Sequence, residues 1–258
     1  MIPKVIHYCW FGHNPLPSLA LKCIKSWIKY LPDYEIKEWN EDNFDINIIP
    51  FVKEAYKVKK YAFVSDYARF WILYHYGGIY FDTDVEIIRS LDDILSKGAF
   101  MGCEVDALEE RGPLVAPGLG IATCPQNEIY KEILDFYNTI HFINEDGSHN
   151  LQTVVEYTTN ILKKHGLTQK EGIQNCDGIY IYPKDYFCPK SYHDLKIHKT
   201  KNTVTIHHFA ASWHTKEENK RHRRQVFWKN HPQLHRIYRW CYLKPRYAAA
   251  RIYHTLAK

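Results

Sequence analysis

The sequence predicts an α/β fold built on a parallel sheet, and two stretches of the chain carry this expectation. Residues 4–10 show an apolar strand pattern, residues 18–30 an amphipathic helix pattern, and residues 34–39 an alternating strand pattern. A strand, a helix and a second strand in this order form a βαβ unit, whose two strands lie parallel. Residues 60–86 then change from a helix pattern to a strand pattern once more. Because ligands bind beyond the carboxyl ends of the strands in such sheets, we expect the functional site there.

The first helix is expected to begin at Ser18, because a serine side chain can cap a helix N-terminus. Apolar residues recur along it at three- and four-residue spacing, which predicts one buried face. This face holds Leu21, Ile24, Trp27, Ile28 and Leu31. The polar residues 40–50 after the second strand are expected to form a loop, and residues 51–60 a short helix.

Residues 60–86 are the most informative part of the chain. Aromatic and aliphatic residues recur at helical spacing in the first half, which predicts a helix with a buried face. Gly77 and Gly78 can adopt the left-handed conformation that ends a helix. Residues 79–81 are apolar and predict a short buried strand.

Two aspartates with one residue between them stand where this strand ends. Asp82 and Asp84 belong to one extended segment, so their side chains point to the same side. Two carboxylates that lie close together repel each other unless a cation or hydrogen bonds compensate them. The pair therefore predicts a site for a divalent metal ion.

The later part of the chain predicts further short elements and one acidic loop. The loop, residues 104–117, is expected to be a lid or an acceptor-binding segment, with a plain solvated loop as the alternative. Helices are expected at 91–95, 126–140 and 151–165, and strands at 99–103, 119–123, 178–182 and from 203 onward. No linker or repeat interrupts these patterns, so residues 1–215 are expected to form one domain.

Composition predicts a soluble protein in a reducing compartment. The chain of 258 residues is 45% hydrophobic and 24% charged, which fits a globular domain with a large core. The start of the chain lacks the apolar segment of a signal peptide, and no apolar run is long enough to span a membrane. The seven cysteines are scattered, without the paired spacing of a zinc site or a disulfide framework. We therefore expect a cytoplasmic protein.

Three short segments give the chain a resemblance to a known family. They are Ser65-Asp66-Tyr67-Ala68-Arg69, Gly77-Gly78-Ile79-Tyr80 and Asp82-Thr83-Asp84. In this order they resemble the signature of family 32 glycosyltransferases, which carry a DXD sugar-binding motif and include yeast-type mannosyltransferases and bacterial capsule and cell-surface polysaccharide enzymes. The order also resembles the clostridial glucosylating toxins. The resemblance implies a GT-A type fold, a Rossmann-like sheet flanked by helices.

The resemblance also implies roles for particular residues. Asp82 and Asp84 would be the catalytic pair, and Asp82 would also support the donor's ribose or the metal. Trp10, in a segment with Ile6, His7 and Gly12, would stack on the nucleotide base; the alternative is a core aromatic. The donor-binding residues implied in this way are Trp10, Asp66, Arg69, Asp82, Ser212 and Trp213.

Asp66 and Arg69 lie three residues apart on one helix face, so both can reach a sugar ring. The alternative is a surface salt bridge that contributes little to stability. Ser212 and Trp213 would donate hydrogen bonds to the donor's β-phosphate. Asn150 and Gln152 are weaker candidates for the reacting face.

A histidine is expected to complete the metal site. His207 stands six residues before Trp213, the spacing that recurs in the family, and the resemblance implies that it binds the metal together with Asp84. His208 points to the opposite face of the same strand. The alternative is that both histidines sit in the sheet without a metal. Carboxylates with one imidazole suit Mn²⁺, or Mg²⁺.

The C-terminal segment differs in charge from the rest of the chain. Residues 216–258 contain 12 Lys and Arg but only 2 Glu, whereas the remaining residues carry 22 basic and 27 acidic side chains. Basic residues mixed with aromatics predict a helical segment that lies on an anionic membrane surface. The alternatives are helices packed on the domain and, least favoured, RNA binding.

The leading function is a metal-dependent glycosyltransferase that moves a hexose from a nucleotide-sugar to a glycan acceptor in polysaccharide synthesis. A UDP-sugar is favoured over GDP-mannose, the acceptor is expected to be lipid-linked, and the resemblance implies retention of anomeric configuration. The protein would then be peripheral on the inner face of the cell membrane. One rival is a haloacid-dehalogenase-like phosphatase, although Val85 and Glu86 depart from its motif. The other rival is a non-enzymatic sugar-binding protein at the membrane surface.

Overall fold

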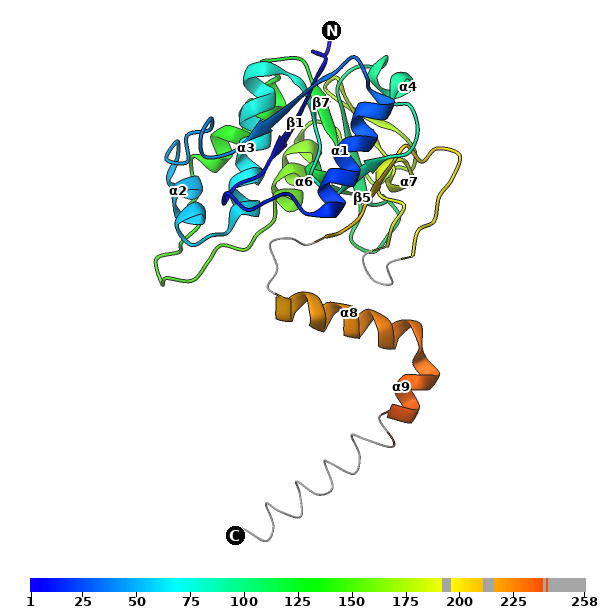
Figure 1. The fold of residues 1–258 in the computed structure, drawn as a ribbon. Helices are drawn as coiled ribbons and strands as arrows, with labels where there is room; N and C mark the ends of the chain where they lie inside the picture. Colours follow the sequence, from blue (N-terminus) through cyan, green and yellow to red (C-terminus); the bar gives the residue numbers. More distant parts are fainter. Residues whose placement is uncertain (192–195, 211–215, 239, 241–258) are drawn as a thin grey trace. The chain divides into compact units, whose positions relative to one another are not determined.

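The computed structural model describes residues 1–191, 196–210, 216–238 and 240 (Figure 1). The chain divides into two compact units. The first contains residues 1–190 and 197–213, and the second contains residues 191–196 and 214–258.

The first unit is organised around an eight-stranded sheet with the order β2-β1-β3-β7-β5-β9-β8, in which β6 pairs with β5. Strands β2, β1 and β3 run parallel, and so do β5 and β9. Because β7 is antiparallel to both β3 and β5, all five parallel strands end at the same edge. The strands are β1 Val5–Cys9, β2 Glu35–Trp39, β3 Gly78–Tyr80, β5 Phe100–Val105, β6 Leu114–Val115, β7 Ile121–Thr123, β8 Gln174–Cys176 and β9 Ile179–Tyr182.

Two hydrophobic cores lie on opposite faces of this sheet (Figure 1). Neighbouring residues of a strand contribute to different cores, as the two-residue period of a strand requires: Ile79 packs in one and Tyr80 in the other. One core is covered by α2 Pro50–Lys57, α3 Tyr61–Tyr76, α5 Glu128–Tyr137 and α6 Val154–Lys164. The other is covered by α1 Ser18–Tyr30, α4 Asp92–Leu95 and α7 Lys184–Phe187. The α/β fold class is therefore confirmed.

Helix α1 buries only part of the stripe that the apolar spacing predicted, since Trp27 and Leu31 are buried but two other predicted residues are not. Leu21 and Ile28 are 47% and 55% exposed, whereas Ala20, Cys23 and Trp27 are buried. The Trp27 indole donates a hydrogen bond to the Val85 carbonyl at 2.7 Å, which fixes this orientation. The helix begins at Ser18 as expected, but without a side-chain cap.

Helix α3 ends at Gly77, whose φ of 64° is in the left-handed region, as the double glycine predicted. The buried His7 ring holds this turn: its Nε2–H donates to the Gly77 carbonyl at 3.0 Å. Its Nδ1 accepts a hydrogen bond from the Trp39 indole at 3.1 Å. Burial lowers the pKa of His7 to about 4, so the ring is neutral. His7, which the sequence placed in the family-like opening segment, therefore ties β1 to the α3–β3 turn.

A second, two-stranded sheet begins directly after the aspartate pair. Strand β4 Val85–Ile87 pairs antiparallel with β10 Thr205–His207. Residues 104–117, expected as one loop, instead contain the end of β5 and all of β6, followed by the 3-10 helix η1 Pro117–Leu119. The predicted strand at 119–123 is reduced to β7, because η1 occupies its start.

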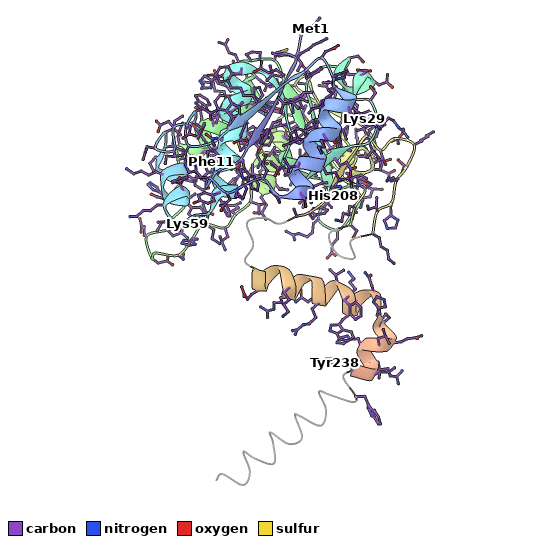
Figure 2. All side chains as sticks on the ribbon, viewed as in Figure 1. Met1, Phe11, Lys29, Lys59, His208 and Tyr238 are labelled. Carbon is purple, nitrogen blue, oxygen red and sulfur yellow. The ribbon has the colours of Figure 1, made fainter. Side chains whose placement is uncertain are left out.

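The second unit contains α8 Lys216–Asn230 and α9 Pro232–Tyr238, so its helical character is confirmed over these residues. Ring stacking joins the two helices, with Trp228 against His235 and Tyr238. Tyr238 is labelled at the end of α9 in Figure 2. Across the described part of the chain, every helix is too short or too polar to cross a membrane.

Candidate active site

The carboxyl edge of the sheet gathers residues that lie far apart in the sequence. Trp10 follows β1, Asp82 follows β3 after one residue, and Glu104 is the next-to-last residue of β5. Because these three strands run in the same direction, their ends meet at one edge. This edge is where the βαβ argument expected a ligand site.

Arg69 forms a buried ion-pair network with two aspartates. One of its terminal nitrogens lies 2.8 Å from Oδ1 of Asp66 and 3.3 Å from Oδ1 of Asp82. Its Nε–H donates to the Ser65 carbonyl at 3.1 Å, and the guanidinium lies over the Tyr80 ring. The Arg69 side chain is only 4% exposed, so the alternative of a surface salt bridge is wrong.

The electrostatics of this network favour a polar ligand. Burial raises the pKa of Asp66 to about 7, although Arg69 acts in the opposite direction. Burial also raises the pKa of Asp82, and Arg69 again opposes it. Two carboxylates thus share one guanidinium in a poorly solvated place, an arrangement that keeps acceptors available for sugar hydroxyls.

Asp84 and His207 form the second half of the site. Nε2 of His207 lies 3.2 Å from Oδ1 of Asp84, and Oδ2 of Asp84 accepts a hydrogen bond from the Ala210 backbone at 2.7 Å. Burial alone would raise the pKa of Asp84, but His207 and the Ala210 N–H lower it to about 2. Burial would lower the pKa of His207, but the Asp84 carboxylate raises it well above the usual value.

Three side chains can offer ligand atoms to one cation. One atom each from Asp82, Asp84 and His207 lies within 4.8 Å of the others. No hydrogen bond of ordinary geometry reaches the buried Nδ1 of His207 within the described residues, so the ring is held mainly through Nε2. Two carboxylate oxygens and one imidazole fit a hard or borderline divalent ion such as Mg²⁺ or Mn²⁺.

His208 stays out of this cluster, as the alternation along the strand predicted. Its Nε2 lies 2.8 Å from Glu86, which also accepts a hydrogen bond from Lys22. The backbone N–H of His208 donates to the Asp84 carbonyl at 2.9 Å. His208 therefore supports the position of Asp84 through its backbone, while its side chain faces the other way.

Two site residues escaped the reading of the sequence. Gly118 of η1 lies against the Asp82 carboxylate so closely that a side chain there would overlap it.

Glu104 is the extra residue of a β-bulge, because the register shifts between Cys103 and Val105 opposite β6. Bulges re-aim side chains and are common beside active sites. Burial raises the pKa of Glu104, with opposing effects from His207 and Arg111. Neither the close contact nor the bulge has a sequence signal of its own.

The remaining predicted residues make other contacts or lie outside the described chain. Trp10 is half-buried, and its indole donates to the Asn14 carbonyl. The amide of Asn150 donates to the Tyr157 hydroxyl at 3.1 Å, and its Oδ1 accepts from the Gln152 backbone at 3.1 Å. None of these contacts involves the aspartate cluster. Ser212 and Trp213 lie outside the described residues.

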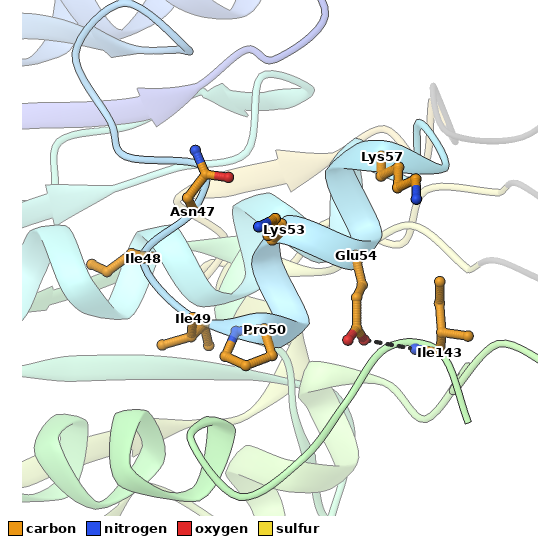
Figure 3. Close-up of a pocket in the computed structure, with 8 residues that line it drawn as sticks. All are labelled: Asn47, Ile48, Ile49, Pro50, Lys53, Glu54, Lys57 and Ile143. Carbon is orange, nitrogen blue, oxygen red and sulfur yellow. Dashed lines mark hydrogen bonds between the residues drawn. The ribbon is translucent and has the colours of Figure 1, made fainter. Parts of the chain in front are cut away.

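A separate surface pocket lies beside α2 (Figure 3). Its wall includes Glu54, whose carboxylate accepts backbone hydrogen bonds from Phe142 and Ile143 at 2.9 and 3.0 Å. This contact ties the segment after α5 to α2. The pocket contains none of the site residues described above.

Comparison with known proteins agrees with this geometry. Residues 17–101 match a family described as a glycosyltransferase sugar-binding region containing a DXD motif. The chain is 36% identical over 104 residues to inositol phosphoceramide mannosyltransferase 3 of Schizosaccharomyces pombe, a match of 39% of this chain and 29% of that protein. It is 37% identical over 106 residues to an uncharacterized glycosyltransferase of Acanthamoeba polyphaga mimivirus, a match of 39% of this chain and 42% of that protein. The chain thus spans less than half the length of these relatives.

Among solved structures, the PaToxG glycosyltransferase superposes with a TM-score of 0.50 and 20% identity, over 63% of this chain and 69% of that one. At this identity the likeness concerns the fold. The family match spans Asp66, Arg69, Asp82 and Asp84, so the predicted resemblance is confirmed over that range. Residues 17–101 therefore contain a DXD-bearing glycosyltransferase sugar-binding region, carried on a fold of the GT-A type.

Proposed function

We propose that this protein is a metal-dependent glycosyltransferase that moves a hexose from a nucleotide-sugar to a hydroxyl-bearing acceptor. The observation that carries the proposal is the cluster of Asp82, Asp84 and His207, with ligand atoms within 4.8 Å of one another. The buried Arg69 connects this cluster to Asp66. One half of the site thus suits a cation and a diphosphate, and the other suits a sugar.

Each half has a distinct task in this proposal. Asp84 and His207, with Asp82, would hold a divalent cation, which supplies Lewis-acid neutralisation of the diphosphate charge. Asp66 accepts hydrogen bonds from sugar hydroxyls, and Arg69 holds both Asp66 and Asp82 in place. Trp10 stacks on the nucleotide base, and Ser212 and Trp213 donate to the β-phosphate.

The donor and the acceptor are proposed by class. The proposed donor is a UDP-hexose or GDP-mannose, and relatives named as mannosyltransferases support mannose as the transferred sugar. Those names also include inositol phosphoceramide, which supports a lipid-linked acceptor. A lipid-linked intermediate of a capsular or cell-surface polysaccharide is the alternative acceptor of the same kind.

The second unit would bring the enzyme to the lipid. Exposed basic residues of α8 include Lys220, Arg221 and Arg224. Phe227, Leu234, Ile237 and Trp240 expose apolar surface in the same unit. This combination suits an anionic membrane surface, at about 1 kcal/mol for each basic residue near it. The location that we propose from this combination is the cytoplasm, with the protein peripheral on the inner face of the membrane.

Vesicle binding tests this part of the proposal. Arg221→Glu with Arg224→Glu should reduce co-sedimentation with phosphatidylserine-containing vesicles and leave the weak binding to phosphatidylcholine vesicles unchanged. Equal binding of the variant and the wild type to anionic vesicles would contradict the membrane role.

A thermal-shift screen tests the donor site. Purified protein is heated with UDP, GDP and their common sugars, each with Mn²⁺, with Mg²⁺ and with EDTA. Stabilisation by one nucleotide that needs the metal supports the proposal and identifies the base. Stabilisation by metal alone, with every nucleotide inactive, would favour the phosphatase alternative. The family match speaks against that alternative, because it includes both Asp82 and Asp84 in a sugar-binding motif.

A further inference from the structure

Lys190 reaches the residue that follows β10, the strand that ends at the metal-ligand candidate His207. Its Nζ donates a hydrogen bond to the His208 carbonyl at 2.5 Å. The backbone N–H of His208 donates to the Asp84 carbonyl at 2.9 Å. The Lys190 ammonium is therefore linked to Asp84 through one peptide segment. Burial lowers the pKa of Lys190, and the Asp84 carboxylate opposes this shift.

The fold brings Lys190 to this place through β9 and α7. Strand β9 ends at the same sheet edge as β3, and α7 follows it. The segment after β9 is tied along β10, since the Thr205 hydroxyl donates to the Phe187 carbonyl at 3.1 Å. The backbone N–H of Val204 also donates to the Tyr186 carbonyl at 2.8 Å. Lys190 is thus held beside β10 by a structured segment.

Among the described residues, no carboxylate lies within ion-pair distance of the Lys190 ammonium, and Asp84 acts on it only from farther away. Lys22, by contrast, lies 2.8 Å from Glu86, and Arg69 pairs with two aspartates. The Lys190 side chain is partly buried, so its charge has lost part of its hydration. A partly desolvated cation with only a carbonyl as partner is stabilised further by a bound anion.

We propose that Lys190 binds the diphosphate of the nucleotide-sugar and of the nucleoside diphosphate product. This inference rests on the proposed function and adds a residue to its site. Asp82 and Asp84 repel phosphate oxygens, so a diphosphate beside them needs positive charge from the metal and from the protein. Arg69 is already engaged by two carboxylates, whereas Lys190 is not. A lysine supplies a compact charge that suits phosphate.

Inorganic pyrophosphate tests the inference, because it carries the diphosphate without a base or a sugar. Calorimetric titration of the full chain with pyrophosphate and Mn²⁺ compares the wild type with Lys190→Gln, Lys190→Arg and Lys199→Met. Glutamine can still donate to the His208 carbonyl but lacks the charge. We expect about tenfold or greater weakening in Lys190→Gln, as loss of a charged hydrogen bond predicts. Lys190→Arg should retain most of the affinity.

Lys199 is the matched control, since it is exposed in the neighbouring segment, and Lys199→Met should bind as the wild type does. Wild-type affinity in Lys190→Gln would overturn the inference. Equal weakening in the Gln and Arg variants, together with a lower melting temperature in both, would show a structural clamp and would overturn it too. If the wild type binds neither pyrophosphate nor any nucleotide with Mn²⁺, the proposed function itself fails.

Discussion

Gly118 and Asp82 are in direct contact at the centre of the candidate site. The backbone N–H of Asp82 donates to the Gly118 carbonyl at 3.1 Å, and a Cβ atom at position 118 would overlap the Asp82 carboxylate. The backbone of Gly118 is not in the left-handed region, so alanine is excluded by this contact and not by conformational strain. The short helix η1 therefore sets where the first aspartate of the motif can lie.

Replacing Gly118 with alanine should displace Asp82 and, through it, Arg69. Overpacking of this kind costs about 1–3 kcal/mol, so metal-dependent nucleotide binding should weaken by roughly tenfold or more. Calorimetry with Mn²⁺ and the nucleotide identified by thermal shift measures the effect. In an Asp82→Ala background, Gly118→Ala should lower the free energy of unfolding much less, because the overlapping carboxylate is gone. The same cost in both backgrounds would refute the contact as the cause.

Asp84→Asn and His207→Gln should each remove metal-dependent binding while the protein remains folded. Both side chains are proposed ligands, and even outer-shell partners contribute about 10- to 100-fold to metal affinity, so we expect losses of at least about 100-fold. Titration with Mn²⁺ measures the loss, and circular dichroism checks the fold. His208→Gln is the matched control, because the His208 side chain faces Glu86 and offers no ligand atom to the metal site. Mn²⁺ affinity that survives in both ligand variants would refute the assignment.

Glu104→Gln should raise the melting temperature at neutral pH and make it less dependent on pH. Burial raises the pKa of Glu104 above its unfolded value, so the folded state disfavours the carboxylate, and stability is lost as the pH rises above the unfolded pKa. The melting temperatures of the variant and the wild type should agree near pH 4 and diverge above pH 6, with the variant higher. Glu110→Gln, in an exposed position nearby, should change neither property. A variant that is less stable at pH 7 would contradict this account.

His165 should also make stability fall as the pH rises, but over a higher pH range than Glu104. Its two ring nitrogens lie 2.7 Å from Glu132 and 2.6 Å from Asp177, and these carboxylates raise its pKa. The stabilisation is therefore complete below the unfolded pKa of about 6.5 and is lost as the pH rises through the folded pKa.

His165→Gln should lower stability by about 1 kcal/mol at pH 5.5 and by much less at pH 9. Thermal unfolding across this range measures the difference. His198→Gln, at an exposed position, is the control. A penalty that stays constant with pH would show that packing, rather than charge, carries the role of His165.

Local patterns were enough to predict the elements that carry the DXD motif. The helical period, the double glycine and the apolar strand each depend on residues close in the chain, and Gly77 has the left-handed φ expected of it. The stripe of α1 was predicted only in part: Trp27 is buried as expected, but Leu21 and Ile28, which have the same spacing, are exposed. The position of the sheet selects Ala20 and Cys23 in their place. These two small residues let the helix pack closely, which a count of large apolar residues does not detect.

The sequence by itself determined the α/β class, the βαβ start, the acidic pair at a strand end and the resemblance to DXD-bearing glycosyltransferases. Tertiary structure decided which distant residues meet that pair. Ala210 donates to Asp84 across 126 positions, Gly118 limits Asp82, and Lys190 reaches the residue after His207. These contacts depend on how non-neighbouring strands order in a sheet and on how a bulge or a 3-10 turn aims the chain. Such choices follow from the packing of the whole core, and no short stretch of sequence encodes them.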